Sequence, residues 1–286
     1  MLLEKYRVAD PTNFSLSDYS TDDEGGLDKD TVREQLMPAN IKRMKKLQEC
    51  LYAENRKALL IVLQAMDAAG KDGIIRHVMA GLNPQGTKVT PFKQPSVEEL
   101  DHDYMWRIHK AIPPRGEIGI FNRSHYEEVI VTRVRDLLPK QMLPPELVDD
   151  QVWQNRFRQI NAYERYLAEN GIYTIKFFLY ISKEEQRNRL LSRLDEPDKN
   201  WKFSVSDIEE REHWDDYHRA YEEMIQATAT ETAPWYVIPA DRKWFARYLV
   251  SEIVRDTLEN MNLVYPDPSP TVLANMDELR QHLLNN

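Results

Sequence analysis

A lysine and two aspartates follow a hydrophobic segment at the point where a helix is expected to begin. Residues 59–73 read Leu-Leu-Ile-Val-Leu-Gln-Ala-Met-Asp-Ala-Ala-Gly-Lys-Asp-Gly. The apolar run predicts a buried strand, and the small residues after it predict a tight turn. In such a turn, backbone N–H groups and the helix N-terminus face an anion while a lysine reaches over it. The segment therefore predicts a phosphate-binding loop built from Ala68, Ala69, Gly70, Lys71, Asp72 and Gly73.

This loop departs from the usual G-x-x-x-x-G-K-[ST] pattern. Ala65 replaces the first glycine, Asp72 replaces the Ser or Thr, and Asp67 lies inside the loop. A carboxylate beside a phosphate repels it unless a cation lies between them, and Mg²⁺ binds through one or two carboxylates plus phosphate oxygens. We interpret Asp67 as a metal ligand, with a solvated turn residue as the alternative. Asp72 either shares the metal or caps the helix N-terminus.

A second motif, residues 121–126, reads Phe-Asn-Arg-Ser-His-Tyr and ends another predicted strand. P-loop enzymes carry a metal-binding carboxylate at the end of the neighbouring strand. Here that position is Asn122, a neutral ligand, so Asp67 and Asn122 form the predicted metal site. Arg123 is expected at the carboxyl edge of the sheet, where ligands bind in open α/β folds. A surface residue at the start of a helix is the alternative for Arg123.

A cationic segment follows later in the chain. Residues 187–206 contain a proline and many charges, which is typical of a mobile lid that closes over phosphates; a solvated helix hairpin is the alternative. Lys93 and Arg133 are predicted to extend the basic groove. The cations predicted for the lid are Arg187, Arg189, Arg193, Lys199 and Lys202.

Together these residues indicate phosphoryl transfer, in which a protein mainly positions groups and neutralises charge. If the acceptor is itself a phosphate, its oxygens are ionised at pH 7 and no general base is required. The pattern therefore favours a nucleotide phosphate over an alcohol as acceptor.

The elements that position these residues alternate along the chain. Five apolar segments between helical segments predict an α/β fold with a parallel sheet covered on both faces. The expected strands are Ala58–Gln64, Thr87–Phe92, Glu117–Phe121, Ile172–Ile181 and Trp235–Ile238. The expected helices include 28–56 (with Pro38 breaking or starting an element), 97–112, 144–170 and 183–194. We expect an N-terminal arm over residues 1–27, a single domain over 28–262 and a trailing tail over 263–286.

Composition excludes several classes of protein. The chain has 286 residues, 42% of them hydrophobic, and a net charge of −9, whereas a protein that coats nucleic acid is normally basic. Its apolar runs are shorter than the ~20 residues of a membrane span, and its N-terminus lacks the apolar stretch of a signal peptide. The single cysteine, Cys50, excludes an internal disulfide framework and fits a reducing cytoplasm.

The ordered motifs 66–73, 121–126 and 195–202 closely resemble those of the second family of polyphosphate kinases, and the resemblance covers about residues 30–260. It implies a P-loop-kinase-like three-layer sandwich with strand order 2-3-1-4-5 and a helical lid. It also implies Mg²⁺, with Mn²⁺ as the alternative, and an inorganic polyphosphate donor. By position, Asp67 and Lys71 are first-motif catalytic residues, Arg123 is the second-motif arginine, and Arg189 and Arg193 are lid arginines.

With Asn at position 122, the chain resembles the subgroup called class III, in which nucleoside mono- and diphosphates are both acceptors. We therefore expect a reversible, Mg²⁺-dependent transfer from polyphosphate to adenine or guanine nucleotides, AMP to ADP and ADP to ATP, by a homo-oligomer (dimer or tetramer). One alternative is an ATP-dependent nucleoside monophosphate kinase. The other is a non-catalytic module that binds polyphosphate or nucleotides.

Overall fold

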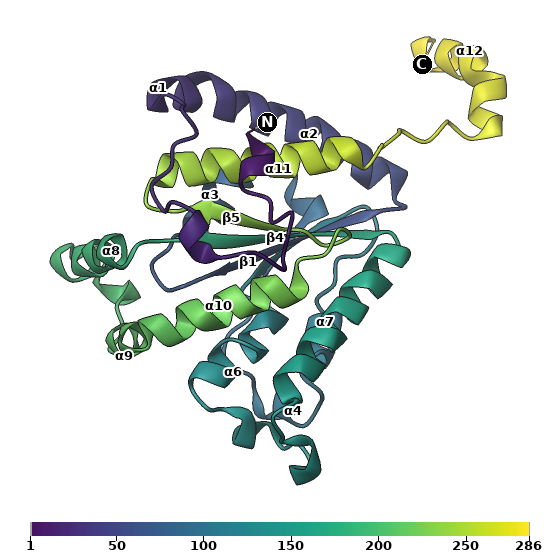
Figure 1. Cartoon of the computed structure of the whole chain (residues 1–286). Helices are drawn as coiled ribbons and strands as arrows, with labels where there is room; N and C mark the ends of the chain where they lie inside the picture. Colours follow the sequence, from purple (N-terminus) through teal and green to yellow (C-terminus); the bar gives the residue numbers. More distant parts are fainter. Residues whose placement is uncertain (1, 286) are drawn as a thin grey trace.

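The computed structural model describes residues 2–285, and a five-stranded parallel sheet lies at its centre (Figure 1). The strand order is β2-β3-β1-β4-β5, as expected. All eight residues of β1 are buried, because the middle strand of a parallel sheet is covered on both faces. The predicted fold class and all five strands are confirmed. The strands are β1 (Ala58–Ala65), β2 (Thr87–Pro91), β3 (Ile118–Asn122), β4 (Ile172–Tyr180) and β5 (Trp235–Pro239).

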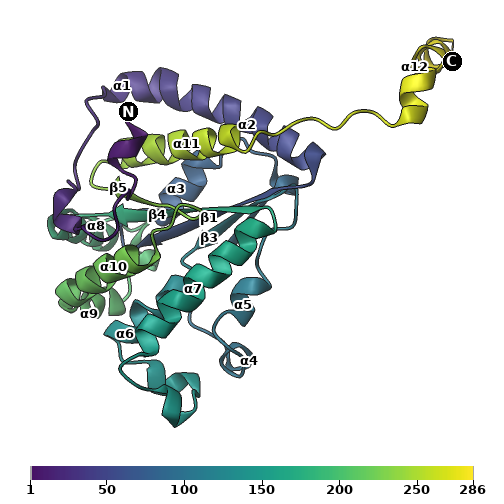
Figure 2. The ribbon, with the colours of Figure 1, turned by 45° about the vertical axis from the view of Figure 1, so that its right-hand side comes forward.

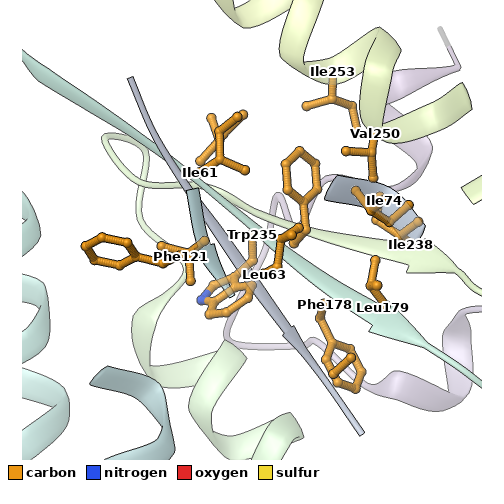
Figure 3. Packing of buried hydrophobic residues seen from close by; sticks show 14 of the residues in the cluster. Ile61, Leu63, Ile74, Phe121, Phe178, Leu179, Trp235, Ile238, Val250 and Ile253 are labelled. Atoms are coloured by element: carbon orange, nitrogen blue, oxygen red, sulfur yellow. The ribbon is translucent and has the colours of Figure 1, made fainter. Parts of the chain in front are cut away.

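Helices cover both faces of the sheet and complete a three-layer sandwich (Figures 1 and 2). One face carries α2 (Met37–Glu54), α3 (Lys71–Val78) and α11 (Lys243–Asn260). The other carries α6 (Val131–Val134), α7 (Val152–Glu169) and α10 (Trp214–Thr228). Figure 3 shows Ile74 of α3 and Val250 of α11 close to Ile238 of β5, within one continuous apolar core. The remaining α-helices are α1 (Lys29–Thr31), α4 (Val97–Leu100), α5 (Trp106–His109), α8 (Lys183–Asp195), α9 (Ser206–Glu212) and α12 (Pro270–Leu284).

Two predicted helices are shorter than the sequence pattern suggested. The segment 97–112 forms α4 and α5 with a turn between them, because the Asp103 carboxylate accepts a hydrogen bond from the Met105 N–H and ends helical continuity. The segment 144–170 becomes helical only at Val152. Its first residues form a 3₁₀ turn, Pro145–Leu147, since adjacent prolines cannot donate helix hydrogen bonds.

Pro38 lies at the second position of α2 and does not interrupt the helical path. The preceding residues Val32–Leu36 form a π-helical turn. Because proline has no N–H, the chain before it lacks one regular helical hydrogen bond, and the wider turn accommodates that loss.

The N-terminal segment lies along the edge of the sheet. The Val8 N–H donates to the Trp235 carbonyl (3.0 Å), and the Val237 N–H donates to the Tyr6 carbonyl (2.9 Å). These bonds place residues 6–8 antiparallel beside β5. The side chains of Tyr6, Val8, Phe14 and Leu16 are buried in the common core.

Helix α12 extends away from the body at the end of a non-helical connection (Figure 2), and its described side chains are exposed. In the described part of the chain, no helix is both long enough and apolar enough to cross a membrane.

Candidate active site

The loop Met66–Gly70 joins the buried strand β1 to α3 at the carboxyl edge of the sheet. Two of its residues adopt left-handed backbone conformations, Ala68 with φ of 62° and Gly70 with φ of 114°. Glycine adopts this region freely, whereas a residue with a Cβ atom does so at a cost of about 1–2 kcal/mol. The loop is therefore a constrained turn that carries the chain onto the N-terminus of α3, where backbone N–H groups favour an anion.

Lys71 is the first residue of α3, and its ammonium group folds back toward the end of β1. Nζ donates a hydrogen bond to the Ala65 carbonyl oxygen at 2.9 Å. Burial, assisted by the positive charge of Arg123, lowers the pKa of Lys71 from 10.5 to about 8, against the opposing effect of Asp67. The cation is thus poorly solvated, and an incoming phosphate would supply the charge partner that water no longer provides.

Arg123 lies beside the loop. Its Nη2 donates to Asp67 Oδ1 at 2.7 Å, and Nη1 lies 3.6 Å from Glu127 Oε2. Although burial opposes the charge, Glu127 and Asp67 together raise the pKa of Arg123. The backbone of Arg123 has φ of 64°, and its N–H donates to Leu63 O at 3.0 Å, which fixes the turn after β3. The structure therefore brings Arg123 to the phosphate loop as a permanent cation.

Asn122 ends β3, directly beside the end of β1. Its Nδ2 donates to Asp72 Oδ1 at 3.0 Å, so the amide orients that carboxylate. The carboxylates of Asp67 and Asp72 and the amide oxygen of Asn122 are hard oxygen ligands of the kind that Mg²⁺ prefers. Among residues 2–285, no group of three or more His, Cys, Asp or Glu could form a metal cage. This small donor set fits Mg²⁺, which keeps water and substrate phosphate among its ligands.

A cavity of about 340 Å³ lies over the loop. Its walls carry most of the residues that the sequence singled out, and the lid contributes cations from above. Lys243, at the start of α11, also lines the cavity but was missed by sequence reasoning. Its position directly after the fifth strand was the available signal. The basic or amide side chains in the walls belong to Lys71, Asn122, Arg123, Arg189, Arg193, Lys199, Lys202 and Lys243.

Lys93 and Arg133 do not line this cavity. Arg133 forms an ion pair with Glu223 on α10, and the carbonyl oxygen of Lys93 accepts a hydrogen bond from Arg107. The residues after Ser124 form a 3₁₀ turn, His125–Glu128, before the short α6. Arg133 is therefore carried toward α10 and away from the loop.

The segment predicted to be a lid, residues 187–206, runs from α8 through the turn Asn200–Lys202 to the start of α9. Arg193 Nη1 donates to the Lys202 carbonyl (3.2 Å) and to Asp207 (3.1 Å), which ties the two ends of the lid together. Lys199 donates to Ser192 Oγ at 3.2 Å and pairs with Glu196. Lys199 is half-buried and Lys202 exposed, so both remain accessible to a ligand.

A buried ionic network supports the second motif from below. Lys176 on β4 donates to Glu164 (2.6 Å), to the Tyr126 hydroxyl (2.9 Å) and to the Thr228 carbonyl (2.8 Å). Burial raises the pKa of Glu164, but Lys176 and His125 together outweigh burial and hold the pKa of that carboxyl below its usual value. The network joins α7, β4 and the turn that follows Arg123, and so fixes the base of the site.

Comparison with known proteins gives consistent results. The family model described as "Polyphosphate kinase 2" matches residues 26–265. The chain is 50% identical over 270 residues to the AMP/ADP-polyphosphate phosphotransferase of Meiothermus ruber, covering 93% of this chain and 96% of that one. It is 44% identical over 283 residues to the ADP-polyphosphate phosphotransferase of Rhodopseudomonas palustris, covering 98% of each. The crystal structure of polyphosphate kinase 2 from Arthrobacter aurescens superposes with a TM-score of 0.88 at 39% identity, covering 96% of this chain and 95% of that one.

Proposed function

Because the chain belongs to the polyphosphate kinase 2 family, we propose that it transfers phosphoryl groups from inorganic polyphosphate to AMP and ADP in a reversible, Mg²⁺-dependent reaction. One observation carries this proposal: two carboxylates, Asp67 in the phosphate loop and Asp72 at the start of α3, line a cavity whose walls carry cations from four parts of the chain. The names of the two relatives that match nearly the whole chain support it. The acceptors are adenine or guanine nucleotides. A cytoplasmic location fits the single cysteine, since the cytoplasm is reducing.

Each group in the cavity has a distinct role. Lys71 and Arg123 neutralise charge on the phosphoryl group as it moves, while Arg193, Lys199, Lys202 and Lys243 bind the phosphates behind it. Asp67, Asp72 and Asn122 would hold Mg²⁺ (or Mn²⁺), which would supply further neutralisation of phosphate charge. An ionised oxygen of the acceptor phosphate forms the new P–O bond as the terminal anhydride bond of the chain breaks. The shortened polyphosphate leaves as an anion.

The test is direct. The purified protein is supplied with AMP, polyphosphate and Mg²⁺, and ADP and ATP are measured; both are expected. A parallel reaction supplies ATP and AMP without polyphosphate. Product only in that reaction would identify a nucleoside monophosphate kinase, and polyphosphate binding without turnover would identify a non-catalytic module.

A matched pair of variants separates the site from general effects. Lys71→Met removes the loop lysine, whereas Lys88→Met removes an exposed lysine on β2. We expect Lys71→Met to lose at least about 100-fold in kcat, the usual scale for one group that stabilises transition-state charge. Lys88→Met is expected to retain the activity of the unmodified chain.

A further inference from the structure

We propose that Arg189 holds the phosphate loop in its binding conformation and that it is not itself a phosphate ligand of the lid. The inference rests on the proposed function, since the loop it positions is the one where phosphoryl transfer would occur. It assigns Arg189 a different role from the lid arginine that its motif position suggested.

The hydrogen bonds of Arg189 carry the argument. A guanidinium has five N–H donors and no acceptor. In Arg189, Nε donates to Glu185 Oε1 (2.7 Å). Nη1 donates to the carbonyls of Ala68 (3.1 Å) and Ala69 (2.8 Å). Nη2 donates to the carbonyls of Ala240 (2.6 Å) and Asp241 (3.1 Å). All five donors therefore have protein acceptors, and the residue is only 8% exposed. A phosphate could gain a hydrogen bond from Arg189 only by breaking one of these.

These bonds join three separate segments at one point. They connect α8 to the phosphate loop and to the connection between β5 and α11. The loop carbonyls that they hold belong to its strained part, since Ala68 has a left-handed backbone. In a planar trans peptide the C=O and N–H groups point in opposite directions. When the Ala69 carbonyl faces Arg189, the N–H of Gly70 faces away from it. Arg189 thus keeps a backbone donor of the loop turned outward for an anion.

The same geometry divides the lid into a fixed and a movable part. Arg189 attaches the first two turns of α8 to the body, so closure has to bend the lid beyond it. Arg193, one turn later, also lines the cavity. Within residues 2–285 the hydrogen bonds that its guanidinium donates all use Nη1 and go to Lys202 and Asp207, both in the lid. Arg193 therefore moves with the lid and keeps donors for phosphate, whereas Arg189 stays with the loop.

Matched substitutions of the two arginines test the assignment. Lysine keeps the positive charge but cannot span five acceptors. In Arg189→Lys we expect kcat to fall on the order of 100-fold, the effect of misplacing reacting groups, with little change in KM for polyphosphate. Hydrogen exchange of the substrate-free protein should become faster at residues 66–72 and 240–242 and stay unchanged in the core strands. Arg193→Lys should raise KM and leave loop exchange as it was.

The opposite pattern would overturn the proposal: a raised KM in Arg189→Lys with kcat retained and loop exchange unchanged. Circular dichroism and thermal melts check folding. If Arg189→Lys does not fold, Glu185→Gln weakens the anchor and leaves the cation in place. Faster exchange in the loop is then expected, and unchanged exchange would reject the proposal. The exchange measurement requires no turnover, so it remains decisive even if the protein shows no activity with polyphosphate and the proposed function fails.

Discussion

Replacing Lys71 with methionine is expected to make the folded protein more stable while it removes activity. Burial and Arg123 lower the pKa of this lysine from 10.5 to about 8. This pKa difference corresponds to about 3 kcal/mol of folding free energy, by which burial of the charged ammonium destabilises the folded protein. Methionine has a similar length and no charge to desolvate. It loses the hydrogen bond to Ala65 O, which for a charged donor offsets about 2 kcal/mol. A net gain of about 1 kcal/mol in the free energy of unfolding is expected at pH 7.

The assay is urea unfolding without substrate or metal, with Lys88→Met as the control, for which a change within about 0.5 kcal/mol is expected. The sign of the pH dependence follows from the lowered pKa. Below about pH 8, Lys71 is charged in both the folded and the unfolded protein, and its burial destabilises the folded state in full. Between about pH 8 and 10.5 the lysine loses its proton in the folded protein but keeps it in the unfolded protein, so this destabilisation decreases. The stability difference between the two proteins should therefore narrow as pH rises. A variant less stable than the unmodified chain at pH 7 would refute the reasoning, since it would mean that Asp67 and Asp72 stabilise the ammonium more than burial destabilises it.

Three further outcomes follow from the site and its support. Removing divalent metal with EDTA should abolish transfer without a change in the circular dichroism spectrum, and added Mg²⁺ should restore it; activity that persists in EDTA would contradict the assigned roles of Asp67 and Asn122. Lys243→Gln should raise KM for polyphosphate by roughly ten-fold, as expected for one lost charged contact of about 1.4 kcal/mol. The control Arg242→Gln removes an exposed partner of Glu24 and should leave KM unchanged. Equal effects of the two substitutions would contradict a specific role for Lys243. Although burial raises the pKa of Glu164, Lys176 and His125 together keep it below 4.5. The stability from that carboxylate should therefore be complete above pH 4.5 and lost as pH falls through the lower pKa of the folded state. Urea unfolding from pH 6 to 3.5 measures this loss, and Glu164→Gln should remove this part of the pH dependence.

The features that the sequence predicted well are those set by neighbouring residues. The apolar run of β1 and the Gly-Lys pair after it specify a strand, a turn and a helix start within one short segment. The five strands were recognisable for the same reason, since each apolar segment is bounded by turn residues. The carboxyl ends of β1 and β3 then meet because the strands are adjacent and parallel, which brings Asn122 to Asp72.

The features that the sequence did not predict depend on partners far away in the chain. Arg133 was expected in the groove, but its partner Glu223 is 90 residues away on α10. Lys243 enters the cavity only because β5 lies at the edge beyond β4. The carbonyl acceptors of Arg189 come mainly from the phosphate loop and from the segment after β5. Arg189 and Arg193 belong to the same sequence motif, and the motif alone does not indicate which of them has N–H donors available for a ligand.

The contact between residues 6–8 and β5 has a consequence for any shortened form of the chain. An open sheet has two border strands whose unpaired backbone groups can recruit a neighbouring molecule. One border, β2, is short and carries Lys88 and Pro91, residue types that discourage such pairing. The other is already occupied by the chain's own first residues. A truncation starting at Asp28 would keep every cavity residue yet leave the backbone groups of β5 open to pairing with another molecule, so the segment most distant in sequence from the chemistry protects one border of the sheet.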